Sequence, residues 1–279
     1  MTPLDLTIPG LTANLIGLNA IICFLVIIVV WAYLFGRVKF SQAVLGAFCC
    51  VVLMLVENLL DNVALAEGSP ILRNAVLHAV YVAAVVAILR AAAQYGVIRL
   101  QLSRRFSDTD AAIGFAIGFA AIELIVGGIS NVTSYTLCVT CNNEGLASIL
   151  ANAASPEEAE ALETMLRQLA TANSWDQAFS GINRIFYLAQ CISVAVLCWY
   201  ASTQHDTKVL GLAMLCHTVV RLPYGLYTAG LLQDFRVEEL LTYVLSIGFA
   251  FLASRYYNRL EGGKFRFRGD RLATRFRRR

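Results

Sequence analysis

The sequence predicts an all-α, polytopic integral membrane protein with seven transmembrane helices. Hydrophobic residues make up 58% of its 279 residues, and its mean hydropathy of +0.65 is well above that of an ordinary soluble domain. Apolar stretches long enough to cross a bilayer core of ~30 Å recur along the chain. They are too long and too uniform for the strands of a membrane barrel. The predicted segments are residues 13–35, 43–65, 71–100, 110–129, 181–201, 208–232 and 237–257.

The basic residues predict how these segments are oriented. On one side of the predicted membrane lie 16 of the 22 lysines and arginines, among them Arg37, Lys39 and those of the C-terminal tail. The positive-inside rule then places the N-terminus outside and the C-terminus in the cytoplasm. We expect one membrane domain over residues 1–262 and a basic cytoplasmic tail over residues 263–279. Because no basic region precedes the first apolar run, we expect no cleavable signal sequence.

The second and third segments carry ionisable side chains. Glu57 and Asp61 are four residues apart and therefore lie on one face of the second helix. His78 and Arg90 belong to the third segment. We expect Arg90 near the cytoplasmic boundary, where a long side chain can extend to water, and therefore give it no part in a site.

The fourth segment combines a small-residue face with a carboxylate. Gly114 and Gly118 begin a run of alanines and glycines, and small residues let membrane helices approach closely. This helix is therefore expected at the centre of the bundle. Glu123 lies on it and is expected to point inward, which makes it the first choice for a functional carboxylate.

A long outer loop is predicted over about residues 130–180. Ser155 followed by Pro156 and Glu158 is typical of a helix start, and apolar residues at helical spacing predict an amphipathic helix over about residues 156–170. Cys138 and Cys141 fall in the same loop. Because no further cysteine pair or loop histidine completes a zinc site, a local disulfide is expected.

The fifth and sixth segments add Arg184, His217 and Arg221. An intramembrane charge costs at least ~2.5–3.5 kcal/mol, so such residues usually pair and face the bundle interior. Two interpretations follow for the polar core formed with Glu57, Asp61, His78 and Glu123. The balance of acids and arginines favours buried ion pairs that fix helix packing. The alternative is a hydrated cavity in which a carboxylate and a histidine activate water.

The C-terminal tail interleaves arginine with Phe265, Phe267 and Phe276. Next to a membrane helix, such a segment is expected to bind anionic lipids of the bilayer. Nucleic acid is not expected as a partner, because the tail is short and follows a helix directly.

Residues 110–123 resemble the fourth-helix signature G-F-G-x-G-H-G-x-x-E of the YhfC family of intramembrane proteases. Residues 87–95 are similar to its F-E-E-x-x-R-Y segment, and residues 175–196 to a segment carrying E-R and a later histidine. Residues 210–217 are similar to its A-x-x-x-H segment. The resemblance implies hydrolysis of membrane-embedded peptide bonds, with glutamates and histidines acting as base or as ligands of a divalent metal such as zinc.

Part of that pattern is present here, and part is replaced. Glu123, Arg184 and His217 match the family's residues. The replacements remove acids and histidines and add positive charge. They are Arg90 and Ala91 for the glutamate pair, Gln94 for the arginine after it, Phe119 for the fourth-helix histidine, Asn183 for the glutamate before Arg184, Gln190 or Cys191 for the next histidine, and Arg221 for an aspartate.

Three hypotheses follow for the function. The first is a catalytically degenerate relative acting as a membrane partner or scaffold, similar at fold level to the seven-helix scaffolding subunit of gamma-secretase. The second is an active peptidase with a rearranged site, in which Glu57 is the base and Glu123 and His217 assist; only here is zinc expected. The third is an outward-facing binder or transporter of a small anion or lipid headgroup held by Arg184 and Arg221. The resemblance implies a bacterial cytoplasmic membrane.

Overall fold

The structure confirms the seven-helix prediction. A computed structural model describes residues 6–34 and 36–260. Within these residues, seven helical spans are long and apolar enough to cross a membrane, so the protein is an integral membrane protein. The spans are α1 (Gly10–Leu34), α2 (Phe40–Ala64), the composite span Ala75–Arg105, α7 (Asp110–Glu144), α10 (Ser174–Thr203), α11 (Thr207–Thr228) and α12 (Phe235–Leu260).

The third span is continuous but not uniformly α-helical. After the short α3 (Pro70–Arg73), it consists of α4 (Ala75–Val80), the π-helical turn η1 (Tyr81–Val85), α5 (Val86–Val97), a second π-helical turn η2 (Ile98–Leu102) and α6 (Ser103–Arg105). Wider turns of this kind redirect the side chains that follow. Here α5, which carries Arg90, follows directly after η1.

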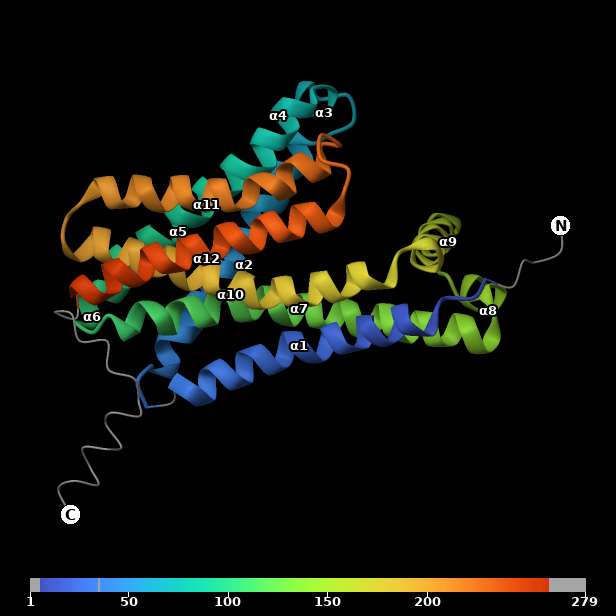
Figure 1. Cartoon of the computed structure of the whole chain (residues 1–279), viewed down its shortest axis with the longest axis horizontal. Helices are drawn as coiled ribbons and strands as arrows, with labels where there is room; N and C mark the ends of the chain where they lie inside the picture. Colours follow the sequence, from blue (N-terminus) through green and yellow to red (C-terminus); the bar gives the residue numbers. More distant parts are fainter. Residues whose placement is uncertain (1–5, 35, 261–279) are drawn as a thin grey trace, which may run out of the picture.

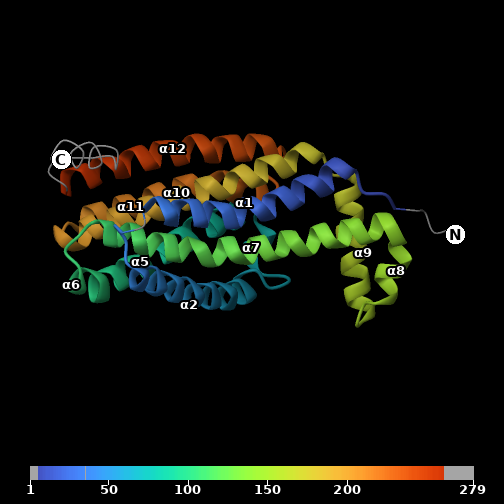
Figure 2. The same cartoon turned by 90° about the horizontal axis from the view of Figure 1, so that it is seen from below.

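Helices α7 and α10 form the centre of the bundle (Figure 1). Helix α7 packs against α1, α2 and α10, whereas α10 also packs against α5, α11 and α12. Figure 2 shows α2 and α12 on opposite sides of this central pair. The start of α1 and the end of α12 lie at opposite ends of the bundle, as an odd number of crossings requires.

Close packing of α2 on α7 confirms the predicted small-residue face. A Cβ atom added to Gly118 would collide with the backbone carbonyl of Ala43, and one added to Gly46 would collide with that of Phe115. Only glycine permits this approach, and it brings Glu57 on α2 and Glu123 on α7 to the same part of the interior.

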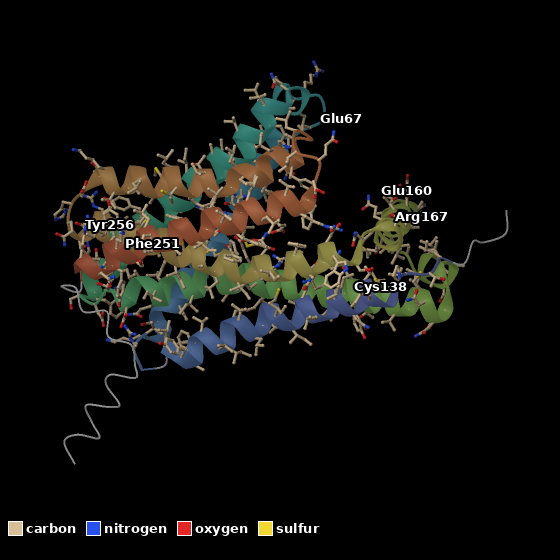
Figure 3. All side chains as sticks on the ribbon, in the orientation of Figure 1. Glu67, Cys138, Glu160, Arg167, Phe251 and Tyr256 are labelled. Carbon is tan, nitrogen blue, oxygen red and sulfur yellow. The ribbon has the colours of Figure 1, made fainter. Side chains whose placement is uncertain are left out.

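The predicted amphipathic helix is α9 (Pro156–Thr171), which the Ser155 hydroxyl caps by accepting a hydrogen bond from the Glu158 amide at 3.2 Å. Together with α8 (Leu146–Ala151) it lies across one end of the bundle (Figure 2). Leu166 of α9 is buried there. Glu160 and Arg167 of α9 lie at this same end, near Cys138 (Figure 3).

Two expectations about the outer loop are wrong. Helix α7 continues to Glu144, so the connection to α10 is much shorter than the predicted loop over 130–180. The added turns are rich in Thr, Asn and Cys, which end an apolar run without ending a helix. Cys138 and Cys141 lie on this extension as buried, free thiols, so the expected disulfide is not formed. The Cys141 thiol instead lies 3.6 Å from the Leu6 carbonyl oxygen, within a cluster of apolar residues.

The opposite end of the bundle carries the basic loops. Arg37 forms two hydrogen bonds of 2.9 Å with the Asp110 carboxylate, which also accepts one from the Tyr257 hydroxyl. Burial lowers the pKa of Arg37, but the hydrogen bonds and charge of Asp110 outweigh it and raise the pKa above its usual value. The predicted lipid-binding tail, residues 263–279, lies outside the described residues.

Candidate functional site

One arginine connects three helices in the interior. The Arg90 guanidinium on α5 donates two hydrogen bonds of 2.7 Å to the two carboxylate oxygens of Glu57 on α2. Its remaining nitrogen, Nη1, lies 2.8 Å from Oε1 of Glu123 on α7 and donates to the Tyr187 hydroxyl on α10 at 3.3 Å. We call Glu57, Arg90 and Glu123 the ion-pair triad.

The expectation that Arg90 extends to water is wrong. Arg90 lies midway along the span Ala75–Arg105 and is only 8% exposed. The charge is held in the interior by two carboxylates and a hydroxyl, which together offer enough acceptors to offset the loss of water. The first interpretation of the polar core, buried ion pairs between helices, is therefore found at Arg90.

A polar cavity of about 410 Å³ opens beside the triad. Its walls come from α5, α7, α10, α11 and α12, and ligand pockets in proteins commonly have volumes of ~300–1,000 Å³. Its charged lining residues are Arg90, Glu123, Arg184, Arg221, Glu238 and Glu239.

Two arginines of the lining have no carboxylate partner. We call Arg184 on α10 and Arg221 on α11 the arginine wall. Across the described residues, every ion pair within 4.0 Å involves other side chains, and the buried Nε atoms of both arginines have no hydrogen-bond partner. The Arg184 guanidinium lies against Gly127 of α7, and the Arg221 guanidinium lies 5.9 Å from the centre of the Tyr224 ring.

Two consecutive glutamates near the start of α12, Glu238 and Glu239, form the acidic wall. They are 2% and 3% exposed, and neither has a basic partner within 4.0 Å among the described residues. Glu238 accepts a hydrogen bond from the Thr242 hydroxyl at 3.2 Å. Glu239 accepts one from the Asn183 amide at 3.1 Å, while its buried Oε2 atom has no partner.

His217 lies beside this network but is not part of the cavity lining. It is 4% exposed, and its buried Nδ1 atom has no hydrogen-bond partner within the described residues. The charged groups that act on it are the arginines Arg221 and Arg90. A histidine on which two positive charges act is poorly placed to bind a metal cation.

Two residues of the predicted polar core lie elsewhere. Asp61, one turn from Glu57 on α2, accepts a hydrogen bond of 2.8 Å from the Tyr81 hydroxyl. His78 lies on α4 and does not line the cavity. Glu57 and Asp61 lie one turn apart on α2, as their spacing predicts, but they bind different partners.

Sequence reasoning missed the acidic wall. Glu238 and Glu239 fall at the predicted helix start, where carboxylates are common because they face the positive end of the helix dipole. The nearby Thr242 gave no signal either. Their burial arises because α10 runs alongside this helix start and places Asn183 against it.

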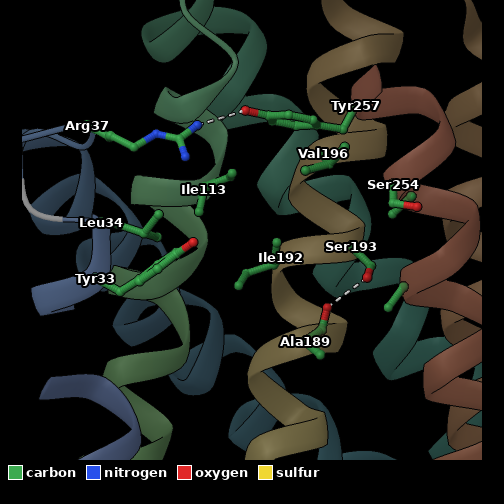
Figure 4. Close-up of a pocket in the computed structure, with 12 residues that line it drawn as sticks. Tyr33, Leu34, Arg37, Ile113, Ala189, Ile192, Ser193, Val196, Ser254 and Tyr257 are labelled. Atoms are coloured by element: carbon green, nitrogen blue, oxygen red, sulfur yellow. Dashed lines mark hydrogen bonds between the residues drawn. The ribbon is translucent and has the colours of Figure 1, made fainter. Parts of the chain in front are cut away.

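A second pocket, of about 320 Å³, lies between α1, α7, α10 and α12 (Figure 4). Its lining is mostly apolar, including Leu34, Ile113 and Ile192, and Arg37 at its edge is already paired with Asp110. Because no charge lacks a partner there, the polar cavity is the candidate functional site.

The fold and the cavity define a class: a polytopic α-helical membrane protein with an ionisable site between its helices. The profile of the YhfC intramembrane metalloprotease family matches residues 21–242, and the chain therefore belongs to that family. It is 21% identical over 170 residues to the membrane protein YhfC of Bacillus subtilis (strain 168), covering 61% of this chain and 64% of that relative. The chain thus spans less than two thirds of the relative's length. A bacterial origin of this chain is consistent with the Bacillus relative. No solved structure matches.

The family description implies a metal, and the residues of this chain do not fit one. Within residues 6–34 and 36–260, no three His, Cys, Asp or Glu side chains are grouped to hold a metal ion. The two carboxylates of the triad, Glu57 and Glu123, both bind the Arg90 guanidinium. A divalent cation at their place would have to displace an arginine that already forms three short contacts.

Proposed function

We propose that the chain is a catalytically degenerate member of its family, which acts by binding as a membrane partner or scaffold. The observation that carries this proposal is the ion-pair triad. A general base or metal ligand needs a free carboxylate, whereas Arg90 engages both oxygens of Glu57 and one oxygen of Glu123.

The second hypothesis, an active peptidase, finds less support. Glu57 would have to leave a bidentate pair with Arg90, and His217 would have to act although it does not line the cavity.

The orientation and the lipid contacts belong to the same proposal. The described basic residues Arg37, Lys39 and Arg99 lie in or beside the connections at the α6 end of the bundle, whereas α9 with its glutamates lies at the other end. We therefore place the α6 end in the cytoplasm, with the tail on anionic lipids.

The first test is hydrolysis. The purified chain is reconstituted in lipid vesicles with transmembrane peptides and assayed with and without zinc, beside Glu57→Gln, Glu123→Gln and the surface variant Glu163→Gln. We expect no cleavage above the peptide-only background in any sample. Cleavage by the wild type that is lost in Glu123→Gln but kept in Glu163→Gln would overturn the proposal.

The second test addresses the partner. The full chain is purified from native membranes in mild detergent, and co-purifying proteins are quantified by mass spectrometry. A stoichiometric membrane protein supports the scaffold role. A chain that is consistently purified alone contradicts it.

A further inference from the structure

Only some of the charges that line the polar cavity belong to ion pairs. In the ion-pair triad, Arg90 is bound to its two glutamates. Within residues 6–34 and 36–260, the arginine wall, Arg184 and Arg221, has no acid within 4.0 Å, and the acidic wall, Glu238 and Glu239, has no base within that distance. All four side chains line one cavity.

Buried charges without partners are costly, and the cost is offset when a ligand supplies the missing charge. A simple anion would compensate the arginine wall and leave two nearly fully buried glutamates uncompensated. A simple cation would do the reverse. The arrangement instead matches a ligand that carries both signs.

The geometry points to a zwitterion of the phosphoethanolamine type as the ligand of this cavity. Its phosphate is held by the arginine wall, because guanidinium groups suit phosphate oxygens. Its primary ammonium group is held by the acidic wall and donates to the unpartnered Oε2 of Glu239. This group is the headgroup of phosphatidylethanolamine and also exists as a free small molecule. The inference rests on the proposed function only in that the cavity binds its ligand without cleaving it.

The primary ammonium group distinguishes phosphoethanolamine from phosphocholine. A primary ammonium has three N–H donors, which Glu238 and Glu239 can accept, whereas a trimethylammonium group has none. We therefore expect phosphocholine to bind at least about tenfold more weakly than phosphoethanolamine, since losing even one charge-assisted hydrogen bond lowers affinity by roughly this factor.

The test measures thermal unfolding of the purified chain in detergent with phosphoethanolamine, phosphocholine, inorganic phosphate or ethanolamine. We expect phosphoethanolamine to raise Tm by roughly 5 °C at about 100-fold its Kd, with much smaller effects of the other three. The inference is overturned if soluble phosphoethanolamine does not raise Tm and phosphatidylethanolamine does not raise it in the lipid measurement below. So does equal stabilisation by phosphate or ethanolamine alone.

Variants then locate the site. Arg221→Gln and Glu239→Gln are each expected to abolish the shift. Arg167→Gln and Glu163→Gln are matched controls. They make the same changes of side chain in an exposed ion pair on α9, outside the cavity. Stabilisation that persists in both cavity variants overturns the assignment. If a cavity variant does not fold, the comparison of phosphoethanolamine with phosphocholine on the wild type still decides.

Lipid nanodiscs separate the two sources of the group. A higher Tm in phosphatidylethanolamine than in phosphatidylcholine discs supports the lipid headgroup as ligand. A shift seen only with soluble phosphoethanolamine supports a free zwitterion. Proteolytic activity would contradict the proposed function but leave this ligand selectivity unchanged, so failures of the two are distinguishable.

Discussion

Replacing Arg90 by methionine tests the ion-pair triad through stability. The substitution keeps most of the side-chain volume but leaves Glu57 and Glu123 facing each other in the interior without their shared cation. Removing one partner of a buried ion pair costs about 3–5 kcal/mol. At roughly 2 °C per kcal/mol for a chain of this size, we expect Tm to fall by about 6–10 °C.

A series of variants separates the contributions of the three members of the triad. Glu123→Gln keeps the bidentate pair between Arg90 and Glu57, so a smaller decrease of roughly 2–4 °C is expected. Replacing all three members by methionine removes the uncompensated charges, and Tm should recover most of the loss. The assay is thermal unfolding in detergent followed by fluorescence.

The matched control is Arg167→Met. Arg167 pairs with Glu163 on exposed α9, where an ion pair is worth at most about 1 kcal/mol. Equal shifts for Arg90→Met and Arg167→Met, or a triple variant less stable than Arg90→Met alone, would refute the account of the triad.

Three further predictions concern the fold. Gly118→Ala should lower Tm by several degrees because its Cβ meets the Ala43 carbonyl. Gly248→Ala is the control, because the space at this position is open. Equal Tm values for the two variants would contradict the close α2–α7 packing. All eight cysteines should react with maleimide after denaturation without reductant, as counted by mass spectrometry, and a count of six would show that Cys138 and Cys141 are oxidised. Asp110→Asn weakens a charge-assisted pair with Arg37 and should cost about 1.5–3 kcal/mol by denaturant unfolding, and an unchanged midpoint would contradict the contact.

The sequence predicted the spans because bilayer thickness imposes long apolar runs, and it predicted the central place of α7 from Gly114 and Gly118. Glu123, which is expected to point inward, binds Arg90 in the interior. Helix length was underestimated at α7, since polar residues end a hydrophobic run while Cys138 and Cys141 continue the helix and are buried.

The partners could not be predicted, because they depend on which helices meet. Arg90 was placed near water from an assumed helix boundary, whereas the span continues to Arg105 and leaves it at the centre. The acidic wall could not be predicted either, because the start of α12 is an interior position only where α10 packs against it. Spacing along one helix assigns a face to a side chain, and tertiary contacts assign its partner.

Metal content is the most direct measurement of the central claim, that an arginine and not a metal ion holds the two interior glutamates. The full chain is purified from zinc-supplemented cells without chelators, and bound metal is quantified by mass spectrometry beside Glu123→Gln and His217→Ala. The account predicts far less than one metal ion per chain, with no change in either variant. One tightly bound zinc ion per chain that is lost in both variants would contradict it.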